Sequence, residues 1–561
     1  KVTVQLLVLL AAWLVLVLLH RHNDGLWFQG DAPRHAANGL FWKDFLLSAD
    51  WLAPRDYALR YFARYPVIHP IAYPPLFYLL EGLTSFILPG ALAGKALVLG
   101  FALLAAVYVM LWLRRWVSPT VGALAALLLL LPGVVEWSHA VMLNVPAMAL
   151  CLAALYHGRR WMEATDPPVS RRQLCLAALW SVLAFYTYLP AGIVALVLLA
   201  WLVILGRWSL LAERRTWLVI VLAALAVLPW LYVLWRWAPT QLSLAKPAAL
   251  LPSTPGSDPG TRPGSESGEA RVAADLWRHW RYYPARITDL VSPYLLGLAA
   301  LGALLGLTAR RTRREVGLAV AWLGVMYVAF SIMHAKEPRY VLLATAPLLV
   351  LSVSGFARCG AWLSRRASPR IVMTIGVVLA ACWLGAQGML AAGTPVRQVS
   401  GFEQLAAYAR QVAPHGPVFY DGHHAGVFTF YVRASDPHFH RQVVTGDKLL
   451  YATALYAWRH VEQYATTPEQ VRKTLRDESG CEYLFIEFGR WSEHFPAARL
   501  LRRTVRGEGF ELVRTFEVRG RHIDHVAVYR LTDPVRPQTT WTLPFPALGD
   551  DASFEVKPIE R

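Results

Sequence analysis

Long apolar runs separated by short polar loops dominate the chain from residue 3 to residue 391. A transmembrane helix needs about twenty apolar residues, so runs of this length predict membrane spans. Eleven runs qualify: 3–20, 92–113, 119–136, 140–157, 173–189, 190–206, 216–236, 291–308, 316–333, 338–357 and 370–391. The pattern therefore predicts a polytopic α-helical membrane protein with about eleven spans.

A further apolar run, Pro74–Leu88, is predicted to lie at the membrane interface instead of crossing. It has fifteen residues, opens with two prolines and carries Glu81 in its middle, which suits an interfacial helix better than a span. If it does not cross, the arginine clusters of five loops share one side: Arg114-Arg115, Arg159-Arg160 with Arg171-Arg172, Arg207 with Arg214-Arg215, Arg310-Arg311 with Arg313-Arg314, and Arg365-Arg366 with Arg370. The positive-inside rule then makes the N-terminus cytoplasmic and places the C-terminus outside.

The predicted organisation is a membrane module followed by a soluble tail. The module covers 1–393, with a first outer loop at 21–91 and a long outer loop at 237–290, and the tail covers 394–561. The middle of the long loop, 252–270, is rich in Pro, Gly and Ser and is expected to be flexible. Its flank, Leu276–Tyr283, mixes aromatic and basic residues and predicts a helix in the headgroup layer.

The tail alternates helical and strand patterns. Helices are predicted at about 401–413 and Pro468–Glu478, and strands at Val418–Tyr420, Tyr483–Ile486, 510–518 and 525–531. This alternation predicts a small C-terminal α/β domain on the outer side of the membrane.

The composition supports a membrane protein and limits the alternatives. Hydrophobic residues make up 56% of the chain and the mean hydropathy is +0.37. The formal charge of +18 would suggest nucleic-acid binding in a soluble protein, but these arginines lie in short loops where they orient spans. The five cysteines form no spacing typical of a disulfide framework or a metal site. Nucleic acid is therefore not an expected partner.

The absence of several known sequence motifs excludes some classes of reaction. The chain has no GxxxxGK[ST], no GxGxxG after a strand and no HExxH, so neither nucleotide binding nor zinc hydrolysis is predicted. Outside an inner membrane, a synthetic reaction needs an activated donor delivered through the bilayer, and the class available is a polyprenyl-phosphate sugar. Such a transfer requires a carboxylate that takes the acceptor's hydroxyl proton and cations that hold the departing phosphate.

The first outer loop offers the carboxylate. The segment 30–48 carries apolar residues at helical spacing, so one face is expected to lie on lipid while the other presents an acid: Leu40, Phe41, Phe45 and Leu46. Asp31 is the predicted catalytic base, because a charge held at a membrane surface is costly unless it is used. The alternative is a helix N-cap. Binding of a divalent cation by Asp31 and His35, which are four residues apart, is a further alternative, although two ligands are a weak metal signal.

The cations are expected from the loop between the ninth and tenth spans, His334–Tyr340. Lys336 and Arg339 are basic residues on the side where the positive-inside rule disfavours them, so orientation does not explain their presence. We expect them to bind the donor phosphate, with Glu337 orienting one of them. Contact with lipid headgroups is the alternative.

Three motifs together resemble the GT-C glycosyltransferases that use polyprenyl-phosphate sugars, especially the protein O-mannosyltransferase and lipid A aminoarabinose transferase type. Gly30-Asp31 with Arg34-His35 resembles the first-loop acidic motif, whose Asp is the family's catalytic residue. Tyr73–Tyr78 resembles the Pro-Pro-Leu-aromatic segment that opens a juxtamembrane helix, and the loop 334–340 is similar to the family's basic loop. The likeness covers residues 1 to about 360, and it implies an eleven-span core, juxtamembrane helices in the first outer loop and an external C-terminal domain.

The chain departs from this family pattern in the residues around its acids. The family often has Asp-Glu where this chain has Asp31-Ala32, and an acid where it has Asn144, so Glu136 is the expected second acid. Tyr73 replaces a Lys or His, and His69 is expected to compensate. The predicted catalytic residues are Asp31 and Glu136, and the predicted substrate-binding residues are Arg34, His35, His69, Tyr73, His139, Asn144, His334, Lys336, Glu337, Arg339 and Tyr340. An ordinary interfacial role is the alternative for Glu136 and His139.

The sequence thus predicts an inverting, monomeric glycosyltransferase of the bacterial inner membrane. It would move a sugar from polyprenyl phosphate to a hydroxyl of a glycolipid, glycan or protein, without a cofactor unless a divalent cation takes part. A non-catalytic transporter or flippase of lipid-linked sugars is the rival, and it would favour inverted repeats with broken helices, which the sequence lacks. A third hypothesis is an assembly factor that acts through the tail. In the tail, Asp421–His424 resembles an acid-histidine cluster but is interpreted as a turn.

Overall fold

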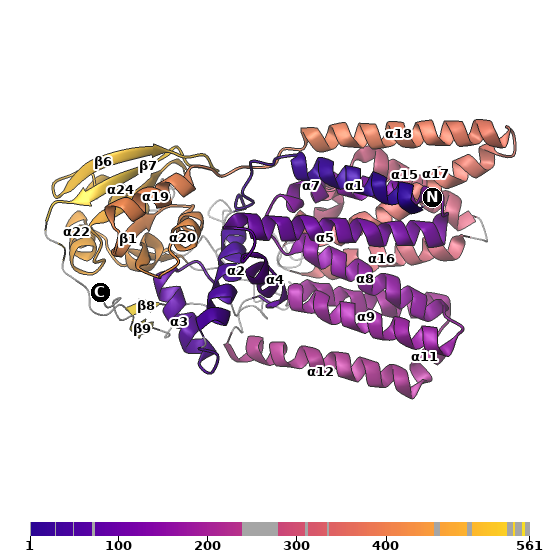
Figure 1. The fold of residues 1–561 in the computed structure, drawn as a ribbon, viewed down its shortest axis with the longest axis horizontal. Helices are drawn as coiled ribbons and strands as arrows, with labels where there is room; N and C mark the ends of the chain where they lie inside the picture. Colours follow the sequence, from indigo (N-terminus) through magenta and orange to yellow (C-terminus); the bar gives the residue numbers. More distant parts are fainter. Residues whose placement is uncertain are drawn as a thin grey trace, which may run out of the picture. The chain divides into compact units, whose positions relative to one another are not determined.

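The computed structural model describes residues 2–28, 30–48, 50–69, 73–237, 279–308, 312–333, 336–453, 461–490, 496–533, 535, 542–544 and 553–555 (Figure 1). The chain forms two compact units, which we call the helical unit and the sheet unit. The helical unit comprises Lys1–Arg21, Tyr73–Phe77 and Val98–Val396, and the sheet unit comprises His22–Ala72, Tyr78–Leu97 and Arg397–Arg561. The segment 252–270 and His334 lie outside the described residues.

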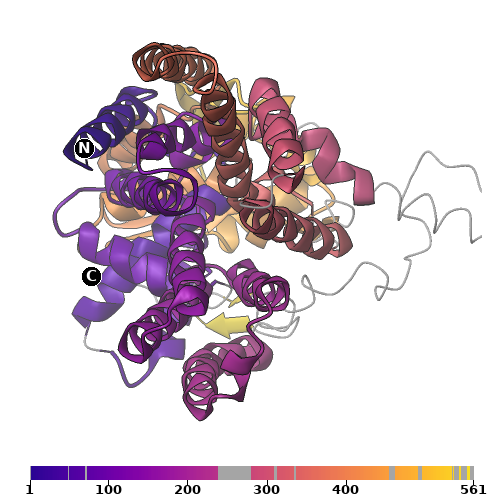
Figure 2. The same ribbon diagram turned by 90° about the vertical axis from the view of Figure 1, so that its right-hand side faces the viewer.

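Helices occupy each of the eleven apolar runs that the sequence predicts. They are α1 (Val2–Leu18), α5 (Ala91–Trp112), η2 with α6 and α7 (Val121–Ala125, Ala126–Leu129, Pro132–Ser138), α8 (Asn144–Glu163), α9 (Pro167–Thr187), η3 with α10 (Leu189–Gly192, Ile193–Leu205), α12 (Arg214–Trp237), α15 (Pro293–Thr308), α16 (Arg313–Ile332), η6 with α17 (Pro338–Ala344, Thr345–Leu363) and α18 (Pro369–Gly393). Figure 2 looks along many of them. Among the described residues, five helices are long and apolar enough to cross a membrane, or up to seven if each bent pair is one span. The count of eleven stays a prediction.

Small residues let two helices of the helical unit approach closely. A Cβ on Gly302 of α15 would overlap the carbonyl oxygen of Leu351 in α17, and a Cβ on Gly355 would lie 3.0 Å from the Cα of Gly302. Such small-residue contacts replace the hydrophobic driving force that is missing between helices in lipid. The packing of α15 on α17 therefore depends on both glycines.

Two short helices have the dimensions of interfacial helices. Helix α4 (Leu76–Thr84) has nine residues, so at 1.5 Å per residue it is about 14 Å long, too short for the hydrocarbon core. The helix His279–Asp289 meets Pro293–Thr308 at 113°. Both observations agree with the interfacial positions expected for Pro74–Leu88 and for the described part of Leu276–Tyr283.

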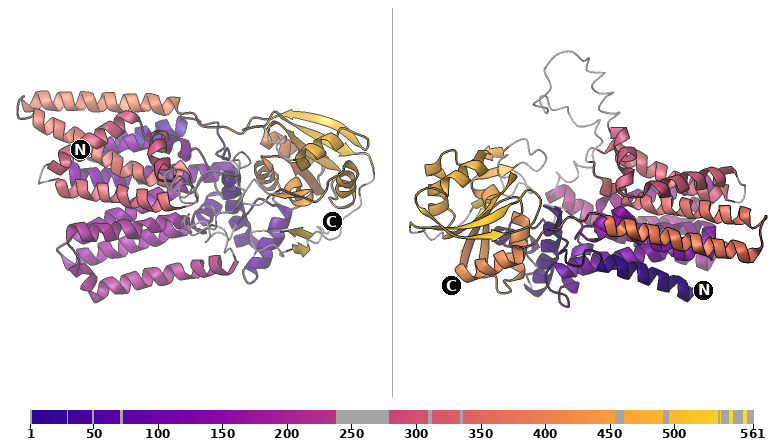
Figure 3. Two further views of the ribbon diagram at one scale, coloured as in Figure 1. Left: turned by 180° about the vertical axis from the view of Figure 1, so that it is seen from behind. Right: turned by 90° about the horizontal axis from the view of Figure 1, so that it is seen from above.

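The sheet unit contains a five-stranded mixed sheet in the order β2-β1-β5-β7-β6. Its strands are β1 (Gly416–Asp421), β2 (Arg441–Thr445), β5 (Tyr483–Phe488), β6 (Phe510–Glu517) and β7 (His525–Leu531), and its helices include α19 (Phe402–Val412), α20 (Ala425–Ala434), α22 (Pro468–Asp477) and α24 (Pro496–Thr504). Strand β1 pairs in parallel with β2 and β5, whereas β7 runs antiparallel to β5 and β6. Figure 3 shows the helices packed against this twisted sheet.

The helices of the first outer loop pack with this sheet, which the sequence did not predict. Helix α2 (Asp31–Ser48) contacts α20, and Ala63 of α3 (Pro54–Arg64) joins the same hydrophobic core as Phe419 and Val444. A grouping of this kind depends on contacts between residues more than 350 positions apart, such as Gln442 Nε2 donating to the carbonyl of Ala63 at 3.1 Å with a separation of 379 residues.

The expected lipid-facing side of α2 is in large part covered. Phe41 and Phe45 are each at most 9% exposed. Phe41 packs on the rings of Tyr57 and Tyr61 at centroid distances of 5.7 and 5.2 Å. The prediction that these aromatic residues lie on lipid is therefore wrong, because α3 folds back and covers them; Leu46 remains 38% exposed.

Candidate functional site

Asp31 begins helix α2. Gly30 precedes it with φ of +71°, a conformation that glycine adopts without strain, so the chain turns sharply into the helix. The carboxylate Oδ1 of Asp31 lies 3.3 Å from Nη1 of Arg34, and both side chains are 22% exposed. An acid in the first turn is stabilised by the positive end of the helix dipole. Asp31 is thus a partly exposed, charge-paired carboxylate, which fits a base that must reach a substrate.

Two more predicted residues lie beside Asp31 on the sheet unit. The Nδ1 of His35 is 2.6 Å from the hydroxyl of Tyr78, and both side chains are buried. The side chain of Asn38 accepts from the backbone N–H of His69 at 2.9 Å, which ties the end of the first outer loop to α2. Burial, with a smaller contribution from the Arg34 charge, lowers the pKa of His69 well below its ordinary value. His69 is therefore neutral at physiological pH, able to donate or accept a hydrogen bond but not to act as a cation.

Glu81 is a buried acid that sequence reasoning noted only as a mark of an interfacial helix. It is 3% exposed, and a Cβ on Gly39 of α2 would lie 2.5 Å from its carboxyl carbon. Burial raises the pKa of Glu81 well above its ordinary value.

The second group of predicted residues lies in the helical unit around Arg339. This arginine is in the 3-10 helix η6, 7% exposed, and its guanidinium carbon lies 5.5 Å from the ring centres of Trp137 and Tyr340. The side chain of Asn144, at the start of α8, donates to the Arg339 carbonyl at 3.3 Å. A buried guanidinium over two aromatic rings is weakly hydrated and pre-oriented, as a phosphate-binding arginine requires.

Lys336 has a role that the sequence did not predict. Its ammonium donates to the carbonyls of Phe330 at 2.8 Å and Ser331 at 2.7 Å, and also to that of Met333. An ammonium has three donors, so Lys336 uses them to cap the C-terminal end of α16. Burial lowers the pKa of Lys336 to about 8. The residue supplies positive charge to the loop, while its N–H groups are engaged by the backbone.

The remaining predicted residues fall in different places. Glu136 and His139 lie at the end of α7 and just beyond it, where the ring of His139 contacts that of His20 at 5.4 Å. Tyr73 belongs to the helical unit and Glu337 precedes η6. The structure thus brings Asp31, Arg34, His35 and His69 together in one unit, and in the other it gathers Glu136, His139, Asn144, Lys336, Glu337, Arg339 and Tyr340.

The acid-histidine segment of the tail is a turn in which Asp421 and His424 are buried. Asp421 ends β1 and forms an ion pair with Arg502 at 2.6 Å. Glu487, at the end of β5, accepts from the backbone N–H of His424 at 3.0 Å and from the Tyr420 hydroxyl at 2.9 Å. Among the described residues, no group of three or more His, Cys, Asp or Glu could hold a metal ion. We interpret this cluster as a structural network that joins the carboxyl ends of the neighbouring strands β1 and β5.

A core of apolar helices and a mixed-sheet tail are the parts of the fold that the resemblance to GT-C glycosyltransferases implies, and comparisons with known proteins support this fold. Residues 69–233 match the family model of dolichyl-phosphate-mannose-protein mannosyltransferases. The structure is similar to that of apo ArnT from Cupriavidus metallidurans, with a TM-score of 0.59 and 17% identity over 96% of this chain and 99% of ArnT.

Two further solved structures show the same fold. ArnT from Cupriavidus metallidurans bound to undecaprenyl phosphate matches with a TM-score of 0.55 and 14% identity, over 96% of this chain and 99% of that one. The oligosaccharyltransferase of Archaeoglobus fulgidus matches with a TM-score of 0.55 and 12% identity, over 92% of this chain and 74% of that one. No curated protein sequence matches the chain. The resemblance to GT-C glycosyltransferases that the motifs predict is confirmed at the level of the fold, and the apolar helices among the described residues indicate a membrane location.

Proposed function

We propose that this protein is a glycosyltransferase that moves a sugar from a polyprenyl-phosphate donor to a hydroxyl acceptor at the outer face of the bacterial inner membrane. One observation carries the proposal: nearly the whole chain shares its fold with nearly the whole of ArnT, which has been solved bound to undecaprenyl phosphate. The donor's lipid carrier is the common element, whereas the sugar and the acceptor differ among GT-C enzymes. The acceptor class is a glycolipid, a glycan or a protein.

In the proposed mechanism, Asp31 is the general base. Its carboxylate takes the proton of the acceptor hydroxyl as that oxygen attacks the anomeric carbon of the donor sugar. The bond between the anomeric carbon and the phosphate oxygen breaks, polyprenyl phosphate leaves, and the configuration at the anomeric carbon is inverted. Arg34, whose Nη1 lies 3.3 Å from Asp31 Oδ1, orients the carboxylate before the substrate arrives.

Charge on the departing phosphate is the second demand of this reaction. Arg339 is the proposed phosphate ligand, because its buried fork can donate two parallel hydrogen bonds to one phosphate. Lys336 adds long-range positive charge and fixes the end of α16 next to η6. Glu136 is proposed as the second catalytic acid, and substrate-binding roles are proposed for His35, His69, Tyr73, His139, Asn144, Glu337 and Tyr340.

The deciding experiment measures polyprenyl phosphate released by the purified protein. Given a polyprenyl-phosphate sugar and an acceptor extract, the protein should release one polyprenyl phosphate per sugar transferred. A transporter would move the intact donor across a liposome bilayer and release none. Movement of donor without release would therefore replace the proposal with the transporter function.

Replacing Arg339 by Met should weaken donor binding by about 10- to 100-fold, because a charge-assisted hydrogen bond contributes about 1.5 to 3 kcal/mol. Met keeps much of the side-chain volume over Trp137, so the fold should persist. The measurement is equilibrium binding of undecaprenyl phosphate to the detergent-solubilised variant. The matched control is Arg286→Met, an arginine of the same unit whose side chain is 56% exposed and paired with Asp289. Unchanged affinity in the Arg339 variant would remove it from the phosphate site.

The titration of Lys336 gives a pH test of the same site. A lysine is charged below its pKa, and burial lowers the pKa of Lys336 to about 8, so its charge is lost as the pH rises through 8. Affinity for undecaprenyl phosphate should therefore fall between about pH 7 and pH 9 in the wild-type protein. The Lys336→Arg variant stays charged throughout this range and should show a flatter profile. Identical profiles for the two proteins would show that the charge of Lys336 does not act on the phosphate.

A further inference from the structure

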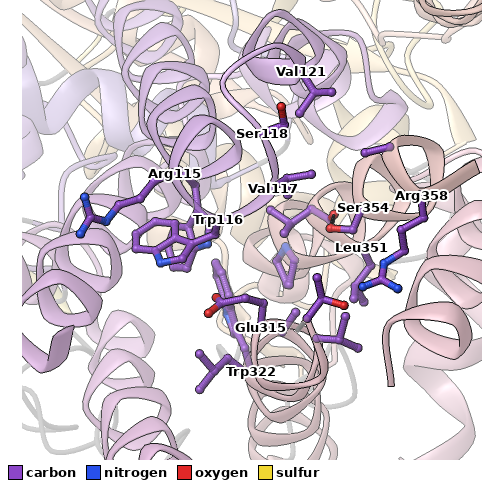
Figure 4. Close-up of a pocket in the computed structure, with 18 of the residues that line it drawn as sticks. Arg115, Trp116, Val117, Ser118, Val121, Glu315, Trp322, Leu351, Ser354 and Arg358 are labelled. Carbon is purple, nitrogen blue, oxygen red and sulfur yellow. Dashed lines mark hydrogen bonds between the residues drawn. The ribbon is translucent and has the colours of Figure 1, made fainter. Parts of the chain in front are cut away.

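A cavity of about 660 Å³ opens in the helical unit, far from the arginine loop. Residues from the end of α5, the first half of α16 and much of α17 line it, and four tryptophans are among the lining residues: Trp112, Trp116, Trp201 and Trp322. Figure 4 shows Arg115 and Trp116 on one side of this space, Ser354 and Arg358 on the other, and Glu315 with Trp322 between them. Its volume is within the range of pockets that hold small-molecule ligands.

The charged residues Glu315 and Arg358 of the cavity lie toward the other end of α16 and α17 from the arginine loop. Glu315, which lines it, is in the first turn of α16, whereas Lys336 follows the end of that helix. The helix has twenty residues, so its length is about 30 Å, the thickness of the hydrocarbon core. The sequence predicts this end to be cytoplasmic, because it carries the arginine clusters of the loops. The cavity is therefore separate from the proposed transfer site.

Most of the charges around the cavity already have partners. Arg115 pairs with Glu163 at 3.3 Å, and Glu315 pairs with Arg159 at 2.6 Å. Arg358 donates from Nη1 to the carbonyl of Leu305 at 2.7 Å, and a guanidinium has five N–H donors, so capacity for an anion remains. Arg358 is thus a cation in the cavity wall that forms no ion pair with an acid among the described residues.

Trp322 supplies an independent sign of a missing ligand. The side chain is 1% exposed, and its indole N–H has no hydrogen-bond acceptor among the described residues. By contrast, the indole of its neighbour Trp201 donates to the carbonyl of Leu318 at 2.9 Å. A buried donor without an acceptor is costly and calls for an explanation. An acceptor atom of a bound molecule would remove that cost.

We propose that this cavity binds one anionic phospholipid from the inner leaflet. The phosphodiester would accept from Arg358, with Ser354 beside it, and a headgroup or ester oxygen would accept from the indole of Trp322. The acyl chains would lie on the apolar wall formed by Val316, Val350 and Leu351. Tryptophan and arginine side chains gathered at one end of a helix bundle suit the membrane interface, where such a lipid is available.

The test measures lipid retention by the purified full-length protein in native mass spectrometry. Dioleoyl-phosphatidylglycerol should bind at one site about ten times more tightly than dioleoyl-phosphatidylcholine. The Arg358→Gln variant should lose about tenfold in affinity for phosphatidylglycerol, because a charge-assisted hydrogen bond is lost. Its matched control is Arg366→Gln, which removes a charge near the end of the same helix from a side chain that stacks on Trp362 at 4.3 Å and does not line the cavity.

A second variant separates ligand binding from folding. Trp322→Phe removes the indole N–H and part of the ring area. Because this N–H has no acceptor among the described residues of the lipid-free protein, the substitution breaks no hydrogen bond there, and no decrease in melting temperature is expected from that cause. The variant should, however, reduce the melting-temperature increase that phosphatidylglycerol gives. Equal losses in Arg358→Gln and Arg366→Gln, equal affinity for the two lipids, or displacement of the lipid by millimolar inorganic phosphate would each overturn the proposal. The last result would mean that the site recognises a phosphate group without the lipid.

Discussion

Replacement of Asp31 by Asn should abolish sugar transfer while the protein stays folded. Asn has nearly the same shape and can still accept a hydrogen bond from Arg34, but it cannot take a proton from the acceptor hydroxyl. General base catalysis contributes about 10²- to 10⁴-fold, so the turnover rate should fall within that range. The measurement is the initial rate of polyprenyl phosphate release at saturating donor, where a loss in binding does not contribute.

Asp50 provides the matched control for this prediction. It lies in the same unit, and its side chain is 48% exposed and forms a surface ion pair with Arg60 at 2.8 Å. The Asp50→Asn variant should therefore keep its rate and its stability, because an exposed pair contributes about 0 to 1 kcal/mol. Wild-type rates in both variants would leave Asp31 with the helix-capping role alone. Equal loss in both would point to disturbance of the first outer loop instead of chemistry.

The helices of the membrane core are the part of the fold that the sequence predicts best. Each apolar run is long enough that its helical state follows from the need to satisfy backbone hydrogen bonds in lipid. Bends within a span were harder to predict. In the run at 119–136, the segments η2–α6 and α7 meet at an angle of 54°, and Pro132 is the one residue that indicates a break there. Proline fixes where the second helix begins but not how far it tilts.

The tail shows where local pattern stops being informative. Strands β1, β5, β6 and β7 were predicted because each has a run of β-branched or aromatic residues, whereas β2, a five-residue strand entirely buried, was not. It contains Arg441 and Gln442, which local propensity assigns to a loop. Their polar groups are satisfied from outside the strand: Arg441 pairs with Asp436, which lies 5 residues earlier, and Gln442 donates to the carbonyl of Ala63, which lies 379 residues earlier. Burial of polar residues by such partners cannot be inferred from one segment.

The candidate site likewise contains residues whose role the sequence predicts and residues whose role depends on contacts between elements. Asp31 and Arg339 were predicted because charges on the outer side of a membrane are informative by type and place alone. The role of Lys336 was missed, since capping depends on where α16 ends relative to the loop, and helix ends are the least certain part of a sequence prediction. Likewise, the closeness of Glu81 to Gly39 depends on how two helices cross, which neither helix specifies by itself.

A buried ion pair fastens the helix of Asp31 to the C-terminal sheet. Arg433 of α20 contacts Asp44 of α2 at 2.5 Å, and both side chains are at most 8% exposed. The hydroxyl of Tyr61 donates to the same carboxylate at 2.7 Å, while the ring of Phe439 lies 4.1 Å from the guanidinium carbon. Arg433 also donates to the carbonyl of Asp436 at 2.7 Å. Because Arg433 and Tyr61 both contact Oδ2 of Asp44, the arrangement depends on both members of the ion pair.

Replacing Arg433 by Met should therefore destabilise the sheet unit by about 3 to 5 kcal/mol, because Asp44 is left as a buried charge without its counter-ion. The measurement is urea unfolding followed by hydrogen exchange of the amides in α2 and β1. The double variant Asp44→Asn with Arg433→Met removes both charges and should recover a large part of that loss. Arg60→Met, which breaks only the exposed pair with Asp50, should cost less than about 1 kcal/mol.

If the single and double Arg433 variants were equally unstable, packing around Phe439 would hold the two segments together instead of the ion pair. If Arg433→Met were as stable as wild type, α2 would be positioned without the C-terminal sheet, and transfer by Asp31 would not depend on that domain.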